Sequence, residues 1–125
     1  MEKRKEDNVL CLDASGNLYA GGGFSYSSGY VTKWNGSSWT DLGLNANDKV
    51  WALCIDASGN VYAAGEFYNS NNKFYVAKWN GSSWTDLGLK ANSAISALCT
   101  DANGNIYAGG SFTNSSNKTY VAVYK

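Results

Sequence analysis

Short apolar stretches, each broken by small polar residues, recur along the chain. In its middle part "WALCID" (51–56) and "VYAAGEF" (61–67) are separated by "ASGN", and "YVAKW" (75–79) and "SSWTDL" (82–87) are separated by Asn-Gly. Runs of this length, rich in β-branched and aromatic residues and bounded by Gly, Asn and Ser, are typical of strands joined by tight turns. No long run carries apolar residues at helical spacing. The pattern therefore predicts an all-β chain, with four antiparallel strands in this segment.

The four-strand pattern is one copy of a repeat. Residues 10–24, 53–67 and 98–112 align without gaps, and the aspartates of successive copies lie 43 and 45 residues apart. The twelve residues "KWNGSSWTDLGL" occur at 33–44 and again, unchanged, at 78–89. Self-similarity at a fixed period decides the architecture before local detail does. It predicts two four-stranded units followed by one of three strands, eleven strands in all.

Two tryptophans flank the Asn-Gly pair in each complete copy. Asn-Gly is the strongest short hairpin signal. A two-residue turn at Asn35–Gly36 would pair Trp34 with Ser37 and Thr32 with Trp39. The two indole rings would then lie diagonally on one face of the hairpin, where cross-strand aromatic contacts contribute roughly 0.2–1 kcal/mol. We therefore predict a structural role for these tryptophans.

A seven-residue signature, Asp-x-x-Gly-Asn-aliphatic-Tyr, occurs at 13–19, 56–62 and 101–107, and "YVAKWNGSSWTDLG" follows its second copy. With these motifs the chain after Asn8 resembles bacterial β-propeller repeat proteins. It differs from WD40 repeats in having no Gly-His or Trp-Asp pair, and from kelch repeats in lacking a paired Gly-Gly before a spaced Tyr and Trp. The resemblance implies four-stranded antiparallel propeller blades, about 2.75 per chain. It implies no particular activity, because propellers host lectins, enzymes and scaffolds.

The repeat divides the chain into a lead-in and three units. We expect a polar N-terminal lead-in at 1–8, a first blade at 9–46, a second at 47–91, and a third at 92–125 that lacks its outer strand. The lead-in "MEKRKEDN" has no apolar residue after Met1, so we do not expect it to complete the last blade as a strand.

Two or three blades cannot close a ring, and an open fan would expose apolar blade faces to water. The contact that stacks one copy of the repeat on the next can also stack the last copy on the first copy of another chain. We therefore expect a closed homo-oligomer, and we favour a dimer with six blades. A nine-bladed trimer and a fragment of a longer natural chain remain alternatives.

Composition narrows the choice of partners. The chain has 10 basic and 10 acidic side chains and a formal net charge of zero, so no overall field favours nucleic acid or anionic lipid. It contains no apolar run of transmembrane length, and "VLCL" after the charged N-terminus is too short for the apolar core of a signal peptide. We expect a soluble chain without an export signal or a membrane partner, and the compartment stays undetermined.

Residues suited to catalysis or metal binding are scarce. The chain has no His, and Cys11, Cys54 and Cys99 occupy the same position of the first strand in successive copies. Zinc sites and thiol nucleophiles require His partners or clustered Cys. We expect free, buried thiols with a packing role, no metal site, no cofactor and no catalytic residues, and hence a protein that is not an enzyme.

The Asp of each "D-A-S/N-G-N" loop is a second candidate for ion binding. Calcium takes six to eight oxygen ligands, whereas each loop offers one carboxylate. We favour an Asx-type turn at Asp13, Asp56 and Asp101, in which the side chain accepts backbone amides.

Longer loops are expected at one end of the blades. The tight turns lie at the opposite end, so the loops "SYSSG", "YNSNNKF" and "TNSSNKT" must share an end with the linkers "NANDKV" and "KANSAI". Aromatic rings beside amides and hydroxyls suit flat polar ligands such as sugars, and a solvated rim without a ligand is the alternative. The predicted binding residues are Trp51, Tyr26, Tyr68, Asn69, Asn72 and Asn114.

Trp51 is distinctive within this set. Its repeat equivalents are Asn8 and Ser96, so the fold does not require an aromatic side chain there. It is either a plug at the mouth of the channel or a platform for a ligand.

Two functions fit these features. The first is a non-enzymatic, lectin-like binding module whose equivalent sites between blades gain avidity on a repeated carbohydrate ligand. The second is a structural, self-assembling propeller fragment, recently duplicated or engineered, without a small-molecule ligand. The near identity of the copies favours the second function, because selection for one asymmetric site makes copies diverge.

Overall fold

The computed structural model of the protein describes residues 7–24, 28–44 and 46–124, and these form three antiparallel sheets without a helix. The first sheet contains β1 (Asp7–Leu12), β2 (Leu18–Phe24), β3 (Ser28–Trp34) and β4 (Trp39–Asp41). The second contains β5 (Val50–Ile55), β6 (Val61–Gly65), β7 (Ala77–Trp79) and β8 (Trp84–Asp86). The third contains β9 (Ile95–Thr100), β10 (Ile106–Gly110) and β11 (Ala122–Tyr124).

The strands follow chain order within each sheet. This meander, with two four-stranded sheets and one three-stranded sheet in the described part of the chain, confirms the predicted all-β blade architecture. β1 begins at Asp7, two residues earlier than the sequence pattern predicts.

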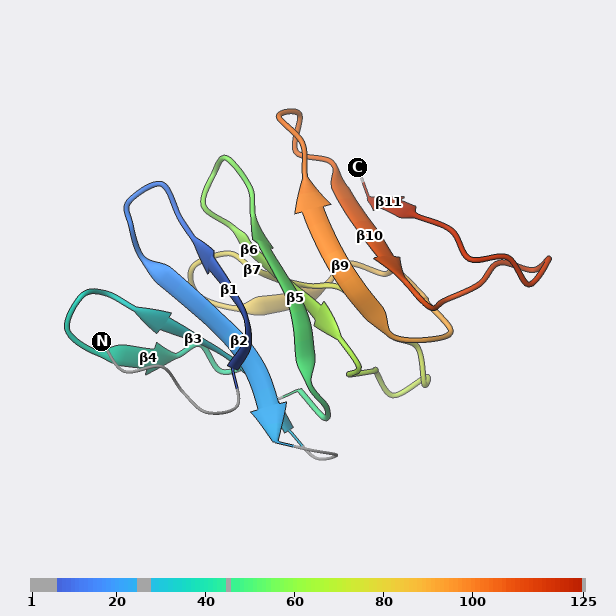
Figure 1. The fold of residues 1–125 in the computed structure, drawn as a ribbon, viewed down its shortest axis with the longest axis horizontal. Coiled ribbons are helices and arrows are strands. Elements are labelled where there is room, and N and C mark those ends of the chain that lie inside the picture. The colour runs from blue at the N-terminus through green and yellow to red at the C-terminus, as the bar shows by residue number, and fades with distance from the viewer. Residues whose placement is uncertain (1–6, 25–27, 45, 125) are drawn as a thin grey trace.

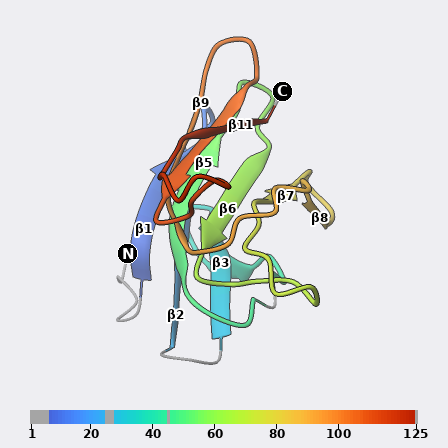
Figure 2. The same cartoon turned by 90° about the vertical axis from the view of Figure 1, so that its right-hand side faces the viewer.

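The three blades lie side by side like an open fan (Figure 1). The first strands β1, β5 and β9 are neighbours across the blades, because β5 contacts both β1 and β9. Figure 2, turned by 90°, shows the second blade from the side, with β5, β6, β7 and β8 following one another away from the row of first strands. The hairpins that join the first two strands of every blade lie together at the upper end in Figure 1.

Apolar side chains fill the space between neighbouring blades. The first interblade core, between blades 1 and 2, comprises Tyr19, Val31, Leu44, Ala46, Val50, Leu53, Val61, Ala63, Phe67 and Ala77. The second interblade core, between blades 2 and 3, comprises Tyr62, Ala64, Val76, Ala91, Ile95, Ile106, Ala108 and Phe112. Most members of the second core are repeat equivalents of members of the first. The repeat thus encodes one packing surface that is used twice within the described chain.

The hairpin between the third and fourth strands differs from the sequence prediction. Trp34 lies directly opposite Trp39, so the loop has four residues, and the predicted pairings of Trp34 with Ser37 and of Thr32 with Trp39 are wrong. The side-chain oxygen of Asn35 accepts hydrogen bonds from the backbone N–H groups of Ser37 and Ser38, at 2.9 and 3.0 Å. This Asx closure competes with the two-residue turn. The ring centroids of the two tryptophans are 5.2 Å apart, so they form a direct cross-strand pair rather than a diagonal one.

The predicted Asx-type turns are confirmed in all three blades. In the second blade, Oδ1 of Asp56 accepts the N–H groups of Ser58 and Asn60, and Oδ2 accepts the Asn60 amide and the Tyr62 hydroxyl. Burial alone would raise the pKa of Asp56, but the hydrogen bonds from Asn60, Tyr62 and Ser58 outweigh it and hold the pKa below its ordinary value. The pKa values of Asp13 and Asp101 are lowered in the same way.

These carboxylates predict a loss of stability in acid. Since their folded pKa values lie below the unfolded value of 3.8, their stabilisation is present above that pH and is lost as the pH falls through the folded values. Asp56→Asn should lower the free energy of unfolding by about 1–2 kcal/mol at pH 7 and make it less dependent on pH below about pH 4. Urea unfolding at pH 7 and pH 3 measures both effects. Asp41→Asn is the control, because that carboxylate accepts a single backbone hydrogen bond, from Gly43; an equal loss for both variants would contradict the assignment.

The cysteines are free, as predicted, but not uniformly buried. Cys11 and Cys54 are partly buried, and burial raises the pKa of their thiols to about 11 and about 12. Cys99 is exposed, so the prediction of burial is wrong there. The reason is positional: Cys11 and Cys54 pack against the two interblade cores, whereas no further blade follows the third sheet among the described residues.

Candidate functional site

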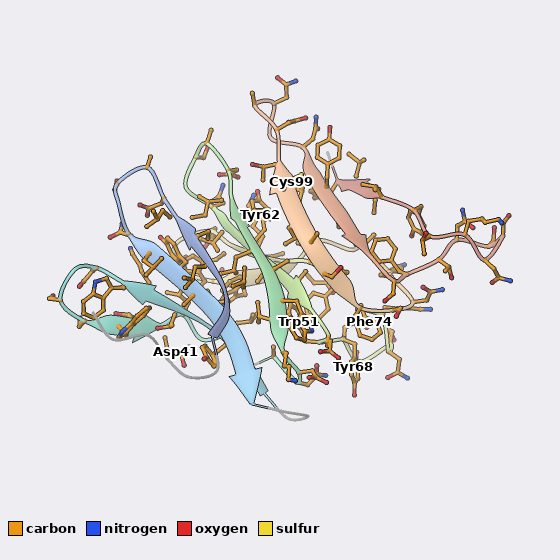
Figure 3. All side chains as sticks on the ribbon, in the orientation of Figure 1. Asp41, Trp51, Tyr62, Tyr68, Phe74 and Cys99 are labelled. Atoms are coloured by element: carbon orange, nitrogen blue, oxygen red, sulfur yellow. The ribbon has the colours of Figure 1, made fainter. Side chains whose placement is uncertain are left out.

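The loop end predicted from sequence is assembled from two kinds of connection. The side-chain amide of Asn47, in the linker between blades 1 and 2, donates to the carbonyl oxygen of Tyr68, and its oxygen accepts the Tyr68 N–H. One repeat later, the side-chain oxygen of Asn92 accepts the Thr113 N–H in the same way, and its amide donates to the Thr113 hydroxyl. Linkers and long loops therefore do share one end. Figure 3 shows Trp51, Tyr68 and Phe74 at that end, with Tyr62 and Cys99 nearer the other.

Trp51 occupies a β-bulge on β5. Val50 pairs with Gly65 and Ala52 with Ala64, which leaves Trp51 as the extra residue. Its indole is 39% exposed, its Nε1 donates to the Glu66 carboxylate, and Lys49 Nζ lies 5.6 Å from its ring centroid. The ring is thus fixed at the surface by its own neighbours.

The other predicted binding residues fall into three groups. Tyr68 is 41% exposed and packs against Phe74, with ring centroids 5.7 Å apart. Asn69, Asn72 and Asn114 shape the loops themselves: the side-chain oxygens of Asn69 and Asn114 each accept two backbone N–H groups, and Asn72 has a positive φ of 59°. Tyr26 lies outside the described residues.

A polar cleft of about 550 Å³ lies between blades 1 and 2, at the end that carries the tight turns. Blade 1 contributes side chains from β2, β3 and β4, and blade 2 contributes its two turns and the end of β7. The residues that line the cleft with polar or aromatic side chains are Tyr19, Lys33, Asn35, Thr40, Ser58, Asn60, Trp79 and Asn80. This cleft was not predicted from sequence.

Lys33 is the cation that lines the cleft, and cross-strand pairing with Tyr19 sets its position. Tyr19 on β2 lies opposite Lys33 on β3, and Lys33 Nζ lies 5.8 Å from the centroid of the Tyr19 ring. The Tyr19 hydroxyl donates to Asp13 Oδ2 at 3.1 Å. Burial, together with this hydrogen bond and the Asp13 charge, raises the pKa of Tyr19 to about 12, so the phenol is neutral at physiological pH. The ammonium group is therefore held beside a neutral aromatic ring.

Trp79 supplies the large aromatic surface of the cleft. It lies at the end of β7 directly opposite Trp84, and the two ring centroids are 5.4 Å apart. Trp84 is itself anchored, because its Nε1 donates to the Leu42 carbonyl oxygen at 2.9 Å. The position of Trp79 is thus fixed by a second tryptophan that belongs to the first interblade core.

The cleft combines polar and aromatic side chains. Its lining offers hydroxyl, amide and ammonium groups beside an indole, and among the lining residues none is an acid, a histidine or a cysteine. Nor does any group of three or more His, Cys, Asp or Glu side chains in residues 7–24, 28–44 and 46–124 have an arrangement that could hold a metal ion.

The pair of a lysine and a signature tyrosine recurs between blades 2 and 3. Lys78 Nζ lies 5.8 Å from the Tyr62 ring centroid, as Lys33 does from Tyr19, but Tyr124 stands at the position of Trp79. A sequence signal for the cleft did exist. Lys33 and Lys78 recur beside a tryptophan, and each is paired across the sheet with the signature tyrosine.

Comparison with known proteins finds a solved structure with a similar fold. No protein-family model and no curated protein sequence matches the chain. Within the part of the chain that the structure describes, no helix is long and apolar enough to cross a membrane. Among solved structures, the chain is similar to a fucose lectin from Kordia zhangzhouensis in complex with methyl-fucoside, with a TM-score of 0.57, 17% sequence identity, and coverage of 92% of this chain and 90% of that chain. At this identity the likeness is one of fold, and it agrees with a propeller-like arrangement of antiparallel blades.

Proposed function

We propose that the protein is a non-enzymatic carbohydrate-binding β-propeller module and that the polar cleft between blades 1 and 2 is its principal site. The observation that carries the proposal is the lining of this cleft, which combines the Trp79 side chain with hydroxyl, amide and ammonium groups from two blades. Sugars present apolar C–H faces and polar hydroxyl edges, which an aromatic ring and fixed hydrogen-bonding groups complement. The fold is shared with a lectin crystallised with methyl-fucoside, which makes that glycoside the first probe.

The loop end is the second location for the same function. Exposed Trp51 and Tyr68 offer aromatic surface there. However, Asn69 and Asn114 use their side-chain oxygens to hold their own loops, which leaves these oxygens less free for a ligand. In the cleft, Asn35 holds its own turn in the same way, so the advantage of the cleft rests on the Lys33 ammonium group beside the Tyr19 ring and on Trp79.

Removal of the indole should weaken sugar binding. Trp79→Ala is expected to reduce the affinity for methyl-fucoside, or for the best ligand of a glycan array, at least about tenfold, which corresponds to about 1.4 kcal/mol. Isothermal titration calorimetry measures the change. Trp79→Tyr, which copies Tyr124 of the third blade, should retain part of the affinity because an aromatic face remains.

Two further variants distinguish a sugar site in the polar cleft from one at the loop end. Trp51→Ala and Tyr68→Ala should leave binding unchanged if the cleft is the site and should abolish it if the loop end is. Thermal unfolding of each variant shows whether the fold is preserved. A wild-type protein that binds nothing across broad glycan arrays would contradict the carbohydrate-binding proposal.

Self-association into a closed ring is the second part of the proposal. Leu10 on β1 is 48% exposed, whereas its repeat equivalent Leu53 is 7% exposed. Val121, beside β11, is 64% exposed, whereas its equivalent Val76 is 3% exposed. Positions that are apolar and buried between blades are thus apolar and open on the two outer faces of the fan. A second copy, stacked first blade on third blade, would cover them.

The mass of the protein in solution tests the proposed self-association directly. Size-exclusion chromatography with light scattering at micromolar concentration should give twice the chain mass of 13.4 kDa, as expected for the six-bladed dimer. Leu10→Lys should shift the protein toward the monomer, because it places a charge on the face to be buried. A monomer that unfolds cooperatively at the same concentration would exclude the ring.

A further inference from the structure

An apolar groove of about 290 Å³ lies between blades 2 and 3. Leu87 and Tyr124, which line it, are the repeat equivalents of Leu42 and Trp79 in the polar cleft between blades 1 and 2. The side chains that shape the groove are aliphatic, apart from one tyrosine at its rim. They include Val76, Leu87, Leu89, Ile106, Ala122 and Tyr124.

The same space between blades 1 and 2 is occupied. There the indole of Trp84 packs on the first interblade core and donates its N–H to the Leu42 carbonyl oxygen at 2.9 Å. Leu87 is the repeat equivalent of Leu42, and it lines the groove between blades 2 and 3. The fold therefore shows which group fits this space: an indole ring with its N–H directed at the Leu87 carbonyl oxygen.

A strand edge lies beside the groove. In the second blade, β8 pairs with β7 so that Trp84 lies opposite Trp79. In the third blade, β11 is the repeat equivalent of β7, and among the described residues it pairs only with β10. A strand added to β11 in the register of β8 places its tryptophan opposite Tyr124, next to the groove. Backbone pairing and indole burial would thus act together, as in other cases of strand addition to a sheet edge.

The two such strands already present in the chain are tied to their own blades. β4 is continuous with Leu42 and Leu44, which pack in the first interblade core, and β8 is continuous with Leu87 and Leu89, which pack against the second. Moving β4 into the groove of another copy would remove the buried Leu44 from its core at a cost of about 2–5 kcal/mol. Moving either strand would also expose leucines that are partly buried now. Strand exchange between copies is therefore disfavoured.

We propose that the groove and the outer edge of β11 together form an acceptor site for an extended peptide segment of the type Ser-Ser-Trp-Thr-Asp-Leu-Gly. The segment adds as the fourth strand of the third blade, its backbone pairs with Ala122 to Tyr124, and its indole fills the groove. This proposal is independent of the sugar site, because it uses different residues and a different ligand.

A capped peptide with the sequence of residues 81–89 tests the proposal. The peptide carries a fluorescent label, and its binding to the full chain is followed by fluorescence polarisation. We expect saturable binding that weakens at least about tenfold when the peptide tryptophan is replaced by alanine, since the indole supplies most of the apolar burial. The absence of saturable binding, or equal affinity of the two peptides, would overturn the proposal.

Protein variants locate the site. Ala122→Phe places a ring in the groove and should weaken peptide binding at least about tenfold. Ser115→Ala is the control: it lies in the same blade and is exposed, but it does not line the groove, so binding should be unchanged. If Ala122→Phe does not fold, hydrogen exchange on the wild-type chain replaces it, and added peptide should slow exchange in β11 while leaving β4 as before. Peptide that binds only by dissociating a preformed dimer would show that a second copy already occupies the groove, and would overturn the assignment to a separate segment.

Discussion

Gly65→Ala is expected to destabilise the protein by about 3 kcal/mol or more, because this glycine sits where the backbone of the opposite strand passes too close for a side chain. A Cβ at Gly65 would lie 2.2 Å from the Lys49 carbonyl oxygen and 2.7 Å from the Trp51 nitrogen. Both contacts are with backbone atoms, so no flexible side chain can move aside. The same carbonyl oxygen accepts the N–H of Glu66 at 2.9 Å, and that hydrogen bond would be strained as well.

The close approach is a consequence of the bulge at Trp51. The extra residue brings β5 toward β6, so the position opposite the bulge requires glycine. The third blade repeats the arrangement, since a Cβ at Gly110 would lie 2.2 Å from the Ala94 carbonyl oxygen. Gly110→Ala should therefore also destabilise the protein.

Gly109→Ala is the matched control. Gly109 precedes Gly110 on β10 and corresponds to Ala64 in the second blade, and a Cβ added to it would meet no atom within 4 Å. Alanine should stabilise the protein there by about 0.4–1 kcal/mol, because it restricts the unfolded chain without a clash. Urea unfolding of the three variants gives the comparison. Equal stability of Gly65→Ala and Gly109→Ala would show that the bulge does not constrain the chain.

The repeat explains why the fold was predictable. Each copy carries the signals of strand, Asx turn and hairpin at fixed spacing, so local chemistry and periodicity point to the same four-stranded unit. The Asp56 loop is the clearest case. An Asp followed by small residues and Asn can satisfy its own backbone amides without help from another segment, and the structure shows the same bonds in every blade.

Features that depend on neighbouring segments are harder to predict. The register of the Trp34–Trp39 hairpin depends on whether Asn35 bonds its own loop or adopts a two-residue turn, and sequence spacing alone does not decide between them. Analogy with Cys54 predicts burial of Cys99. However, a residue at this position is covered by the neighbouring blade and not by its own repeat unit. The polar cleft has the same origin: its lining comes from two copies of the repeat, which meet only when two blades pack together.

Trp84→Ala is expected to be the most damaging change among the tryptophans of the two identical hairpins, with a loss of about 3 kcal/mol in the free energy of unfolding. The indole fills the space between blades 1 and 2 against the first interblade core. Its removal leaves a void there and deprives the Leu42 carbonyl oxygen of its hydrogen bond from Nε1. Urea unfolding followed by circular dichroism measures the loss.

Trp39→Ala separates packing within a blade from packing between blades. Trp39 has the same sequence neighbours as Trp84 and a similar cross-strand contact, with ring centroids 5.2 Å from Trp34 against 5.4 Å for the pair of Trp84 with Trp79. The first interblade core includes Trp84 among its packed neighbours but not Trp39. The loss for Trp39→Ala should therefore be only about 1 kcal/mol, the value of the aromatic pair. A difference of about 2 kcal/mol between the two variants would measure what an indole contributes between blades, whereas equal losses would mean that the tryptophans act only as clips within their hairpins. Equal losses would also weaken the proposal that an indole fills the groove between blades 2 and 3, because that proposal is argued from the contact of Trp84 between blades 1 and 2.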